Sequence, residues 1–172
     1  LCAEPITVPV GLEFVWGLLI SKANLQNDKH KIKYIAVASL YSKPDSRRKA
    51  ILYDHIAETY HYLTSKYGEN LHFIIAGDTN ELKLQPILDL SSRLRQVVTV
   101  FTRHNPDKIL DPIITTLSKF YQSPVAKPPL DPDPDKNGKP ADHDIVLMLP
   151  ITNQASAPAR QKKKITFRPL PE

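Results

Sequence analysis

Apolar and polar residues alternate along the first half of the chain in a pattern that predicts two strands and then one long helix. Residues 12–20 and 32–41 are rich in aromatic and branched side chains, and the polar segment between them predicts a long hairpin loop. Residues 46–67 carry apolar side chains at spacings of three and four, the period of an amphipathic helix. The stripe consists of Leu52, Ile56, Tyr60, Leu63 and Tyr67, with Gly68 placed as a helix stop.

The most informative stretch is Leu71–Ala76 with the polar residues that follow it. Leu71–Ala76 is almost entirely apolar and predicts a strand buried on both faces. The strand ends at Gly77 and is followed by Asp78 and Asn80, whose side chains point the same way if the strand geometry continues. The strand–helix–strand order predicts a parallel crossover, which brings Tyr41 and Asp78 to one sheet edge. Open α/β folds bind ligands at that edge, although an ordinary Asx turn is the alternative explanation.

The second half of the chain predicts shorter elements. Asp111 lies among apolar neighbours, and Pro112 beside it favours an edge strand or a bulge. We expect a helix over 85–94, strands over 96–101 and 108–116, a proline-rich loop over 124–140 and a final buried strand over 145–149.

Composition limits the class of protein. A chain of 172 residues suits one domain with a real core, and 41% hydrophobic with 24% charged residues is typical of a globular protein. No apolar run approaches the ~18 residues that a membrane span needs. The single cysteine, Cys2, excludes an internal disulfide and a cysteine-based zinc site, and it is compatible with a reducing compartment. The first residues show no signal-peptide pattern, and we expect the chain to be cut from a longer protein.

The charge balance is basic. A net charge of +5 and a pI near 9.2 favour a polyanionic partner. Part of this excess lies near the end of the chain, where the sequence is also polar and proline-bearing. We therefore expect a domain over residues 1–151 and a basic, proline-containing linker or tail over 152–172.

Two further polar groups need an explanation beside the Asp78 turn. Asp111 is a carboxylate inside an apolar segment, and buried carboxylates need a partner. The pair Asp142-His143 precedes the last strand, and His143 is available as an N–H donor or cation for Asp111. On the long helix, His55 and His61 are six residues apart, so they face different sides and do not form a helical metal pair; we expect both to be exposed.

Together these groups resemble a known superfamily. The chain carries four motifs, each at a strand end: Tyr41, Gly77–Asn80, Leu110-Asp111 and Ala141–His143. Their order resembles that of the endonuclease/exonuclease/phosphatase superfamily, which includes deoxyribonuclease I and the apurinic/apyrimidinic endonucleases. In more detail, residues 38–49 and 163–172 are similar to the endonuclease domain of a non-LTR (LINE-type) retrotransposon. The resemblance covers about residues 10–151.

The resemblance implies a fold and a chemistry. The fold is α/β, with two mixed β-sheets packed as a sandwich and flanked by helices. The activity is Mg²⁺-dependent phosphodiester hydrolysis, in which Asp78 activates water, Asn80 holds that water or the phosphate, and His143 donates to a phosphate oxygen. Asp111 fixes the tautomer of His143. The remaining roles are a hydrogen bond from Tyr41 to the scissile phosphate and a Mg²⁺ ligand at Asp142.

The resemblance also implies partners. The substrate is DNA, bound through its phosphate backbone, and a reverse transcriptase domain is expected in the full-length element although it is absent from this chain. We expect no membrane association, a monomer, and an intracellular location that is nuclear if the substrate is genomic DNA.

The chain departs from the superfamily pattern at two places. Ala141 stands where the closing motif usually has Ser, which removes a hydroxyl but no reacting group. The upstream strands that carry an Asn and the main metal-binding Glu are not found, since Glu4 and Glu13 do not lie in such a motif. We therefore expect missing N-terminal strands and weak or no cleavage by this chain. The alternatives are a phosphatase of the same superfamily and a non-catalytic nucleic-acid-binding remnant.

Overall fold

The mixed α/β class expected from the sequence is confirmed. A computed structural model describes residues 6–20, 32–43, 46–80, 82–104, 106–129 and 143–151. Its main sheet is five-stranded and mixed, in the order β1 (Glu13–Ile20), β2 (Tyr34–Tyr41), β3 (Leu71–Asp78), β7 (Ile113–Thr115) and β4 (Arg95–Gln96). Two short sheets pair β5 (Arg103–His104) with β6 (Asp107–Lys108) and β8 (Val125–Lys127) with β9 (Ile145–Leu147).

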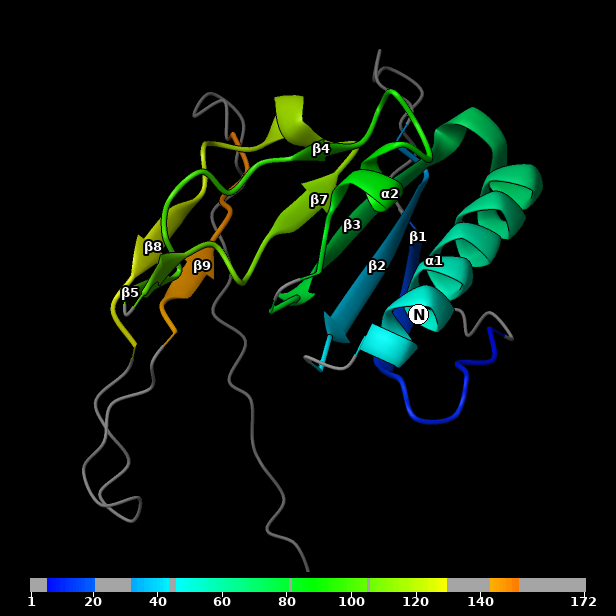
Figure 1. Ribbon diagram of the computed structural model, residues 1–172. Coiled ribbons are helices and arrows are strands. Elements are labelled where there is room, and N and C mark those ends of the chain that lie inside the picture. Colours follow the sequence, from blue (N-terminus) through cyan, green and yellow to red (C-terminus); the bar gives the residue numbers. More distant parts are fainter. Residues whose placement is uncertain are drawn as a thin grey trace, which may run out of the picture.

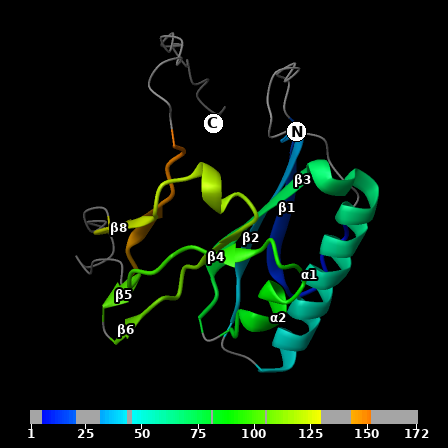
Figure 2. The ribbon, with the colours of Figure 1, turned by 90° about the horizontal axis from the view of Figure 1, so that it is seen from above.

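The helices and the short sheets lie on opposite sides of the main sheet. The long helix α1 (Ser46–Tyr67) and the short helix α2 (Gln85–Leu88) lie on one side, and β5, β8 and β9 lie away from α1 in both views (Figures 1 and 2). Short 3-10 turns follow α1 (Gly68–Asn70) and β7 (Ser118–Phe120). The arrangement is consistent with the two-sheet sandwich that the sequence predicts. Among the described residues, no helix is long and apolar enough to cross a membrane.

The first four elements are those that the hydrophobic pattern predicts. β1 pairs antiparallel with β2, and β2 pairs in parallel with β3 after the crossover through α1. The register aligns Glu13 with Tyr41 and Tyr41 with Asp78, so three strands present one residue each at the same edge of the sheet. This edge carries the residues discussed below.

The core lies between α1 and the main sheet. Four of the five stripe positions are buried, and Tyr67 packs at the border of the same cluster. The prediction that His55 is exposed is wrong, because its side chain is only 5% exposed and its Nε2 accepts a hydrogen bond from Trp16 Nε1 at 3.2 Å. Burial is the cause that lowers the pKa of His55, since it disfavours the charged ring.

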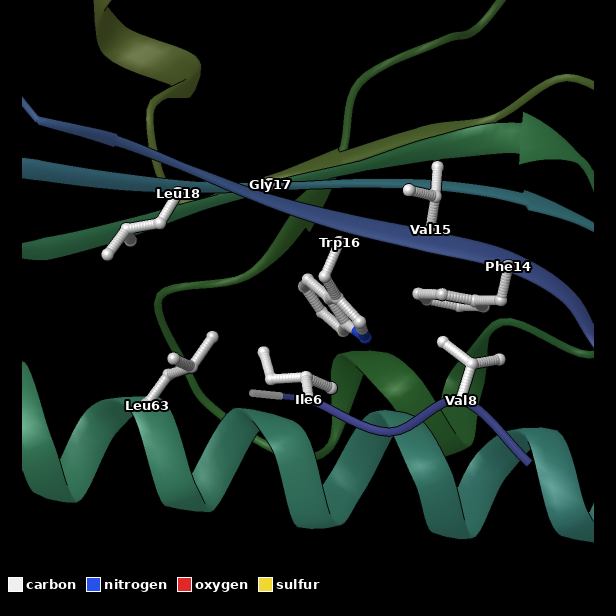
Figure 3. A pocket seen from close by; sticks show the side chains of 8 residues that line it. All are labelled: Ile6, Val8, Phe14, Val15, Trp16, Gly17, Leu18 and Leu63. Carbon is white, nitrogen blue, oxygen red and sulfur yellow. The ribbon is translucent and has the colours of Figure 1, made fainter. Parts of the chain in front are cut away.

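An apolar hollow of about 170 Å³ borders this core between β1 and α1. Figure 3 shows Phe14, Trp16 and Leu18 of β1 turned toward α1, with Ile6 and Val8 of the segment before β1 between the strand and the helix, while Val15 points to the other side of β1. The lining residues are Ile6, Val8, Phe14, Val15, Trp16, Gly17, Leu18 and Leu63, none of which is titratable. The hollow is therefore an edge of the core and not a reaction site.

Several elements of the second half differ from the predictions. The predicted helix 85–94 has only one turn, α2, and the predicted strand 96–101 is reduced to β4. The predicted strand 108–116 is interrupted in its middle. Pro112 has no N–H to donate, and the N–H groups of Leu110 and Asp111 bond Thr102 Oγ1 instead of a neighbouring strand. Of the predicted strand, Lys108 lies in β6 and residues 113–115 form β7. β7 is interior to the sheet, between β3 and β4, and is not an edge strand.

Burial was also overestimated for two strands. On β3 only the face toward α1 is fully buried, and Ile74 and Ala76 on the other face are half-buried. The last strand is shorter than predicted, and Ile145 and Leu147 of β9 are exposed. Its partner β8 lies inside the segment 124–140 that we expected to be a loop. The prolines of that segment disfavour a strand, so the three residues that pair with β9 could not be recognised from the sequence.

At Gly77 the backbone of β3 lies close against the backbone of β2. A Cβ built there would lie 1.9 Å from the Leu40 carbonyl oxygen, and its φ of +143° is rarely adopted by other residues. We predict that Gly77→Ala lowers the free energy of unfolding by about 3 kcal/mol, because backbone must move. Urea denaturation followed by circular dichroism measures this.

Gly68→Ala is the matched control for that variant. Gly68 also has a positive φ, of +62°, but nothing lies within 4 Å of a Cβ built there. Its substitution should cost only about 1 kcal/mol, the price of the left-handed conformation. Equal losses for the two variants would contradict the close approach at Gly77.

Candidate active site at the carboxyl end of β3

The corner after β3 is held by its own polar groups. Asp78 Oδ1 accepts the Asn80 N–H at 2.9 Å, and Asn80 takes the left-handed conformation with a φ of 46°. The Asn80 side-chain Nδ2 donates to the Ser42 carbonyl at 2.8 Å, and the Ser42 N–H donates to the Asp78 carbonyl at 2.8 Å. Asn80 therefore also joins the ends of β2 and β3, and the Asx turn considered from the sequence is present as part of the site.

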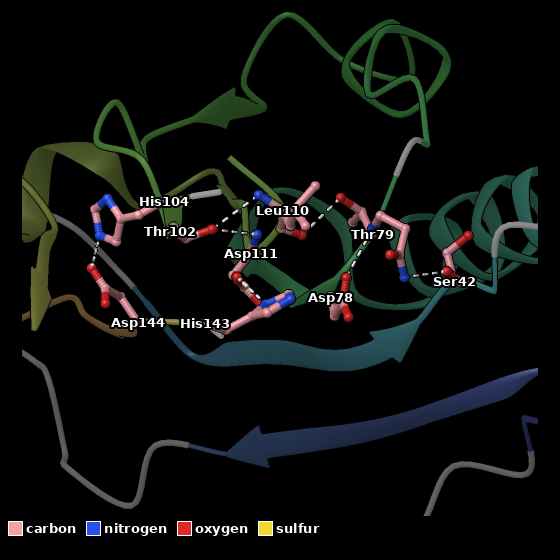
Figure 4. A network of polar contacts seen from close by, with 10 residues as sticks. Ser42, Asp78, Thr79, Thr102, His104, Leu110, Asp111, His143 and Asp144 are labelled. Atoms are coloured by element: carbon pink, nitrogen blue, oxygen red, sulfur yellow. Dashed lines mark hydrogen bonds and ion pairs between the residues drawn. The ribbon is translucent and has the colours of Figure 1, made fainter. Parts of the chain in front are cut away.

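Asp111 and His143 meet beside this corner. His143 Nδ1 lies 2.9 Å from Asp111 Oδ2, and the two side chains are 26% and 23% exposed. One ligand atom each from Asp78, Asp111 and His143 lies within 4.8 Å of the others. Figure 4 shows the three side chains converging from segments far apart in the sequence. The contact between His143 and Asp111 that the sequence predicts is thus present.

Two buried threonines hold these segments together. Thr79 donates both its N–H and its hydroxyl to the Leu110 carbonyl, at 2.8 and 3.0 Å. Thr102 Oγ1 accepts the N–H groups of Leu110 and Asp111 at 2.9 and 3.2 Å, and the Thr102 carbonyl accepts the Asp144 N–H at 2.7 Å. The hydroxyls therefore fix Asp111 between the corner after β3 and the segment that carries His143 (Figure 4).

The sequence did not single out either threonine. Thr79 occupies the variable position of the Gly-Asp-x-Asn motif, so the motif residues on either side mark its place in the site. Thr102 had no such signal, because it stands in an unremarkable segment and its importance depends on residues eight and nine positions further along the chain.

Tyr41 and Glu13 lie on the same edge, beyond Asp78. Tyr41 is 40% exposed and in register with Asp78, so its ring is available to a ligand at the edge. Glu13 is in register with Tyr41 and forms an ion pair with Lys43 at 2.6 Å. Lys43 is a cation at this edge that sequence reasoning missed. Asp142, with Ala141 and Glu4, lies outside the described residues.

A second histidine–carboxylate pair extends the polar network. His104 Nε2 lies 2.8 Å from Asp144 Oδ2 (Figure 4), and Asp107 Oδ1 lies 3.8 Å from His104 Nδ1. The hydrogen bond to Asp144 and the charge of that carboxylate raise the pKa of His104 above its ordinary value. The His104 side chain is 63% exposed and that of Asp144 only 11%, so solvent reaches this pair from the side of the imidazole.

The donor set is suited to a hard divalent cation. Mg²⁺ prefers oxygen ligands, keeps several waters and is commonly held by one or two carboxylates. Asp78 and Asp111 supply two carboxylates within reach of each other. The imidazole of His143 is bonded to Asp111, which favours a role in hydrogen bonding over one as a Mg²⁺ ligand.

Comparison with solved structures gives distant likenesses, one of which is described below. No protein-family model and no curated protein matches the chain. The chain is similar to a crystal structure of humanized D. rerio TDP2 carrying 14 mutations, with a TM-score of 0.40 and 11% identity, over 69% of this chain and 56% of that one.

The Thr102 hydroxyl yields a direct test of how the site is assembled. We predict that Thr102→Val lowers the free energy of unfolding by about 2 kcal/mol, because the N–H groups of Leu110 and Asp111 lose their buried acceptor. Thr102→Ser keeps the hydroxyl and should lose only about 1 kcal/mol, for one buried methyl group. Urea denaturation measures both. A valine variant as stable as the serine variant would refute the role of the hydroxyl.

The pair of His104 and Asp144 predicts a pH dependence. Because the folded pKa of His104 is raised, the stability that it contributes is present below the unfolded value and is lost as pH rises through the folded value. Asp144→Asn should lower the pKa of His104, as followed by NMR of its ring protons. Asp89→Asn, a change at the exposed end of α2, is the control and should leave that titration unchanged.

Proposed function

We propose that this chain carries the site of a metal-assisted phosphodiesterase acting on nucleic acid. The observation that supports it best is the convergence of Asp78, Asp111 and His143, with ligand atoms within 4.8 Å. Hydrolysis of a phosphodiester needs a base for the water, a donor for the phosphate oxygens and neutralisation of negative charge. A carboxylate, an oriented imidazole and a cation site at one sheet edge meet those three needs.

His143 and Asp111 act as one unit in this proposal. His143 Nδ1 lies 2.9 Å from Asp111 Oδ2, and we assign the Nδ1–H to this contact, which fixes the ring orientation. In this proposal Nε2 is the atom that acts on the substrate. In its protonated form the ring donates Nε2–H to a phosphate oxygen. The Asp111 carboxylate then stabilises the charge on the imidazole as negative charge develops on the phosphate.

Asp78 and Asn80 act on the water. Asp78 Oδ1 is bonded to the Asn80 N–H, which keeps the carboxylate at the corner, and we assign Asp78 the proton of the attacking water. The Asn80 side chain is bonded to the Ser42 carbonyl, so Asn80 contributes by shaping the corner. Its assignment to the water or to the phosphate rests on the resemblance, as does the hydrogen bond from Tyr41 to the phosphate.

The cation in this proposal is Mg²⁺. Asp78 and Asp111 would hold it, together with Asp142, which the resemblance implies. When bound, it supplies positive charge to the phosphate and makes the attacking water more acidic.

The narrower assignment is a target-nicking DNA endonuclease of a retroelement. It is supported by the motif order and by the sequence similarity of residues 38–49 and 163–172 to LINE-type endonuclease domains. The net charge of +5 favours a polyanionic substrate. A phosphatase would share the same corner, so the substrate has to be tested directly.

The test is nicking of supercoiled plasmid with protein in excess and Mg²⁺ or Mn²⁺ present, because weak cleavage is expected. Asp78→Asn and His143→Gln should each reduce the nicking rate by about 100-fold or more, the usual effect of losing a proton-transfer group. Parallel assays use bis(p-nitrophenyl) phosphate as a diester and p-nitrophenyl phosphate as a monoester.

Asp89→Asn is the control for a general effect of removing a carboxylate, since Asp89 bonds only Gln85 on α2 among the described residues. Nicking that survives in Asp78→Asn would refute the proposal, because a contaminant or another site would then cleave. Hydrolysis of the monoester alone would replace the nuclease by a phosphatase.

A further inference from the structure

A polar hollow, separate from the apolar one beside β1, lies at the opposite end of β3 from Asp78. It encloses about 760 Å³ and includes His72, the second residue of β3. His72 and Asp78 are six positions apart, which places them on the same face of the strand and about 20 Å apart. The lining residues that matter below are His72, Arg93, Arg95, Thr116, Lys119 and Glu69.

The charges of this hollow are unbalanced. Arg93, Arg95 and Lys119 line it against one carboxylate, Glu69. Within the described part of the chain, none of the three cations forms an ion pair with a carboxylate. Unpaired cations that share a hollow repel one another, and an anionic ligand removes that repulsion.

Arg93 is held in place by neutral groups. Its Nη2 lies 3.3 Å from His72 Nδ1 and 3.5 Å from the Leu71 carbonyl. Burial, and then the charge of Arg93, lower the pKa of His72, so the ring is neutral near pH 7 and its Nδ1 accepts from the guanidinium. Thr116 Oγ1 lies 3.2 Å from the same Nδ1 and accepts the Phe73 N–H, so the residue after β7 holds the His72 ring against the end of the sheet.

Arg95 is oriented in the same way. Its Nη1 donates to the carbonyls of Ser92 and Leu94 at 2.6 and 2.8 Å. A guanidinium has five N–H donors, so each arginine keeps donors beyond those fixed to the backbone or to His72. Two oriented guanidinium groups with a nearby ammonium and several hydroxyls are the groups that bind phosphate oxygens.

We propose that this hollow binds the phosphate backbone of a nucleic-acid strand at a distance from the catalytic corner. Its volume exceeds that of a single phosphate ion, and its cations stand on two segments of the chain, Arg93 and Arg95 around the start of β4 and Lys119 in the turn Ser118–Phe120, which fits successive phosphates of one strand. The inference does not depend on the proposed hydrolysis, because the hollow shares no residue with Asp78, Asp111 or His143.

The test is binding of a fluorescein-labelled single-stranded 20-mer by anisotropy, without metal and over a series of salt concentrations. The variant combines Arg93→Gln, Arg95→Gln and Lys119→Gln. We expect at least tenfold weaker binding at low salt and a salt dependence whose slope falls by about 2, close to 0.7 for each lost contact. The whole chain, carrying Asp78→Asn, is used throughout, so a failure of catalysis does not affect the result.

The matched control combines Lys49→Gln, Lys83→Gln and Lys127→Gln, which removes the same charge from other surfaces. It should change the affinity less than threefold. A further variant, Arg93→Lys with Arg95→Lys, retains charge and should keep most of the salt slope. That variant separates lost contacts from misfolding, and circular dichroism confirms that each protein is folded.

Three outcomes would overturn the proposal. The first is equal loss of affinity in the hollow variant and in its matched control. The second is binding that depends on residues 160–172 and not on the hollow, as shown by deleting that segment. The third comes from two NMR titrations, one with inorganic phosphate and one with the oligonucleotide. If only inorganic phosphate shifts the signals of Arg93 and Lys119, the hollow is a site for free phosphate.

Discussion

The hydroxyl of Thr102 accepts the backbone N–H groups of Leu110 and Asp111, and the hydroxyl of Thr79 donates to the Leu110 carbonyl. Both threonines are buried, so these bonds are shielded from competition with water. They take the place of strand pairing in this segment, and they set the distance between Asp111 and the end of β3. Without them the site would contain the same residues but no fixed arrangement.

The main sheet supplies the rest of that arrangement. The parallel pairing of β2 with β3 puts Tyr41 beside Asp78. Because Gly77 has no Cβ, the end of β3 can lie against the backbone of Leu40. The Thr102 carbonyl then accepts the N–H of Asp144, which places His143 next to Asp111. The catalytic proposal therefore depends on hydrogen bonds between segments that are distant in the sequence.

The sequence predicted the parts of the fold that have long, regular periods. β1, β2, α1 and β3 were found because eight or more residues repeat one pattern in each, and the convergence on Asp78 followed from their order. The later elements could not be predicted as well, because they are two to four residues long and are determined by side-chain bonds such as those of Thr102. His55 was misjudged because its burial depends on Trp16, a contact across 39 positions.

Asp78 and Asp111, with His143 beside them, form the corner at which we propose that a divalent cation binds. Titration of ¹⁵N-labelled protein with Mn²⁺, a paramagnetic substitute for Mg²⁺, locates that cation, because the metal broadens nearby amide signals. We expect the signals of Asp78, Asn80, Asp111 and His143 to broaden first, and we expect Asp78→Asn with Asp111→Asn to abolish the effect. Broadening centred on other residues, or broadening that persists in that double variant, would show that the cation does not bind between Asp78 and Asp111.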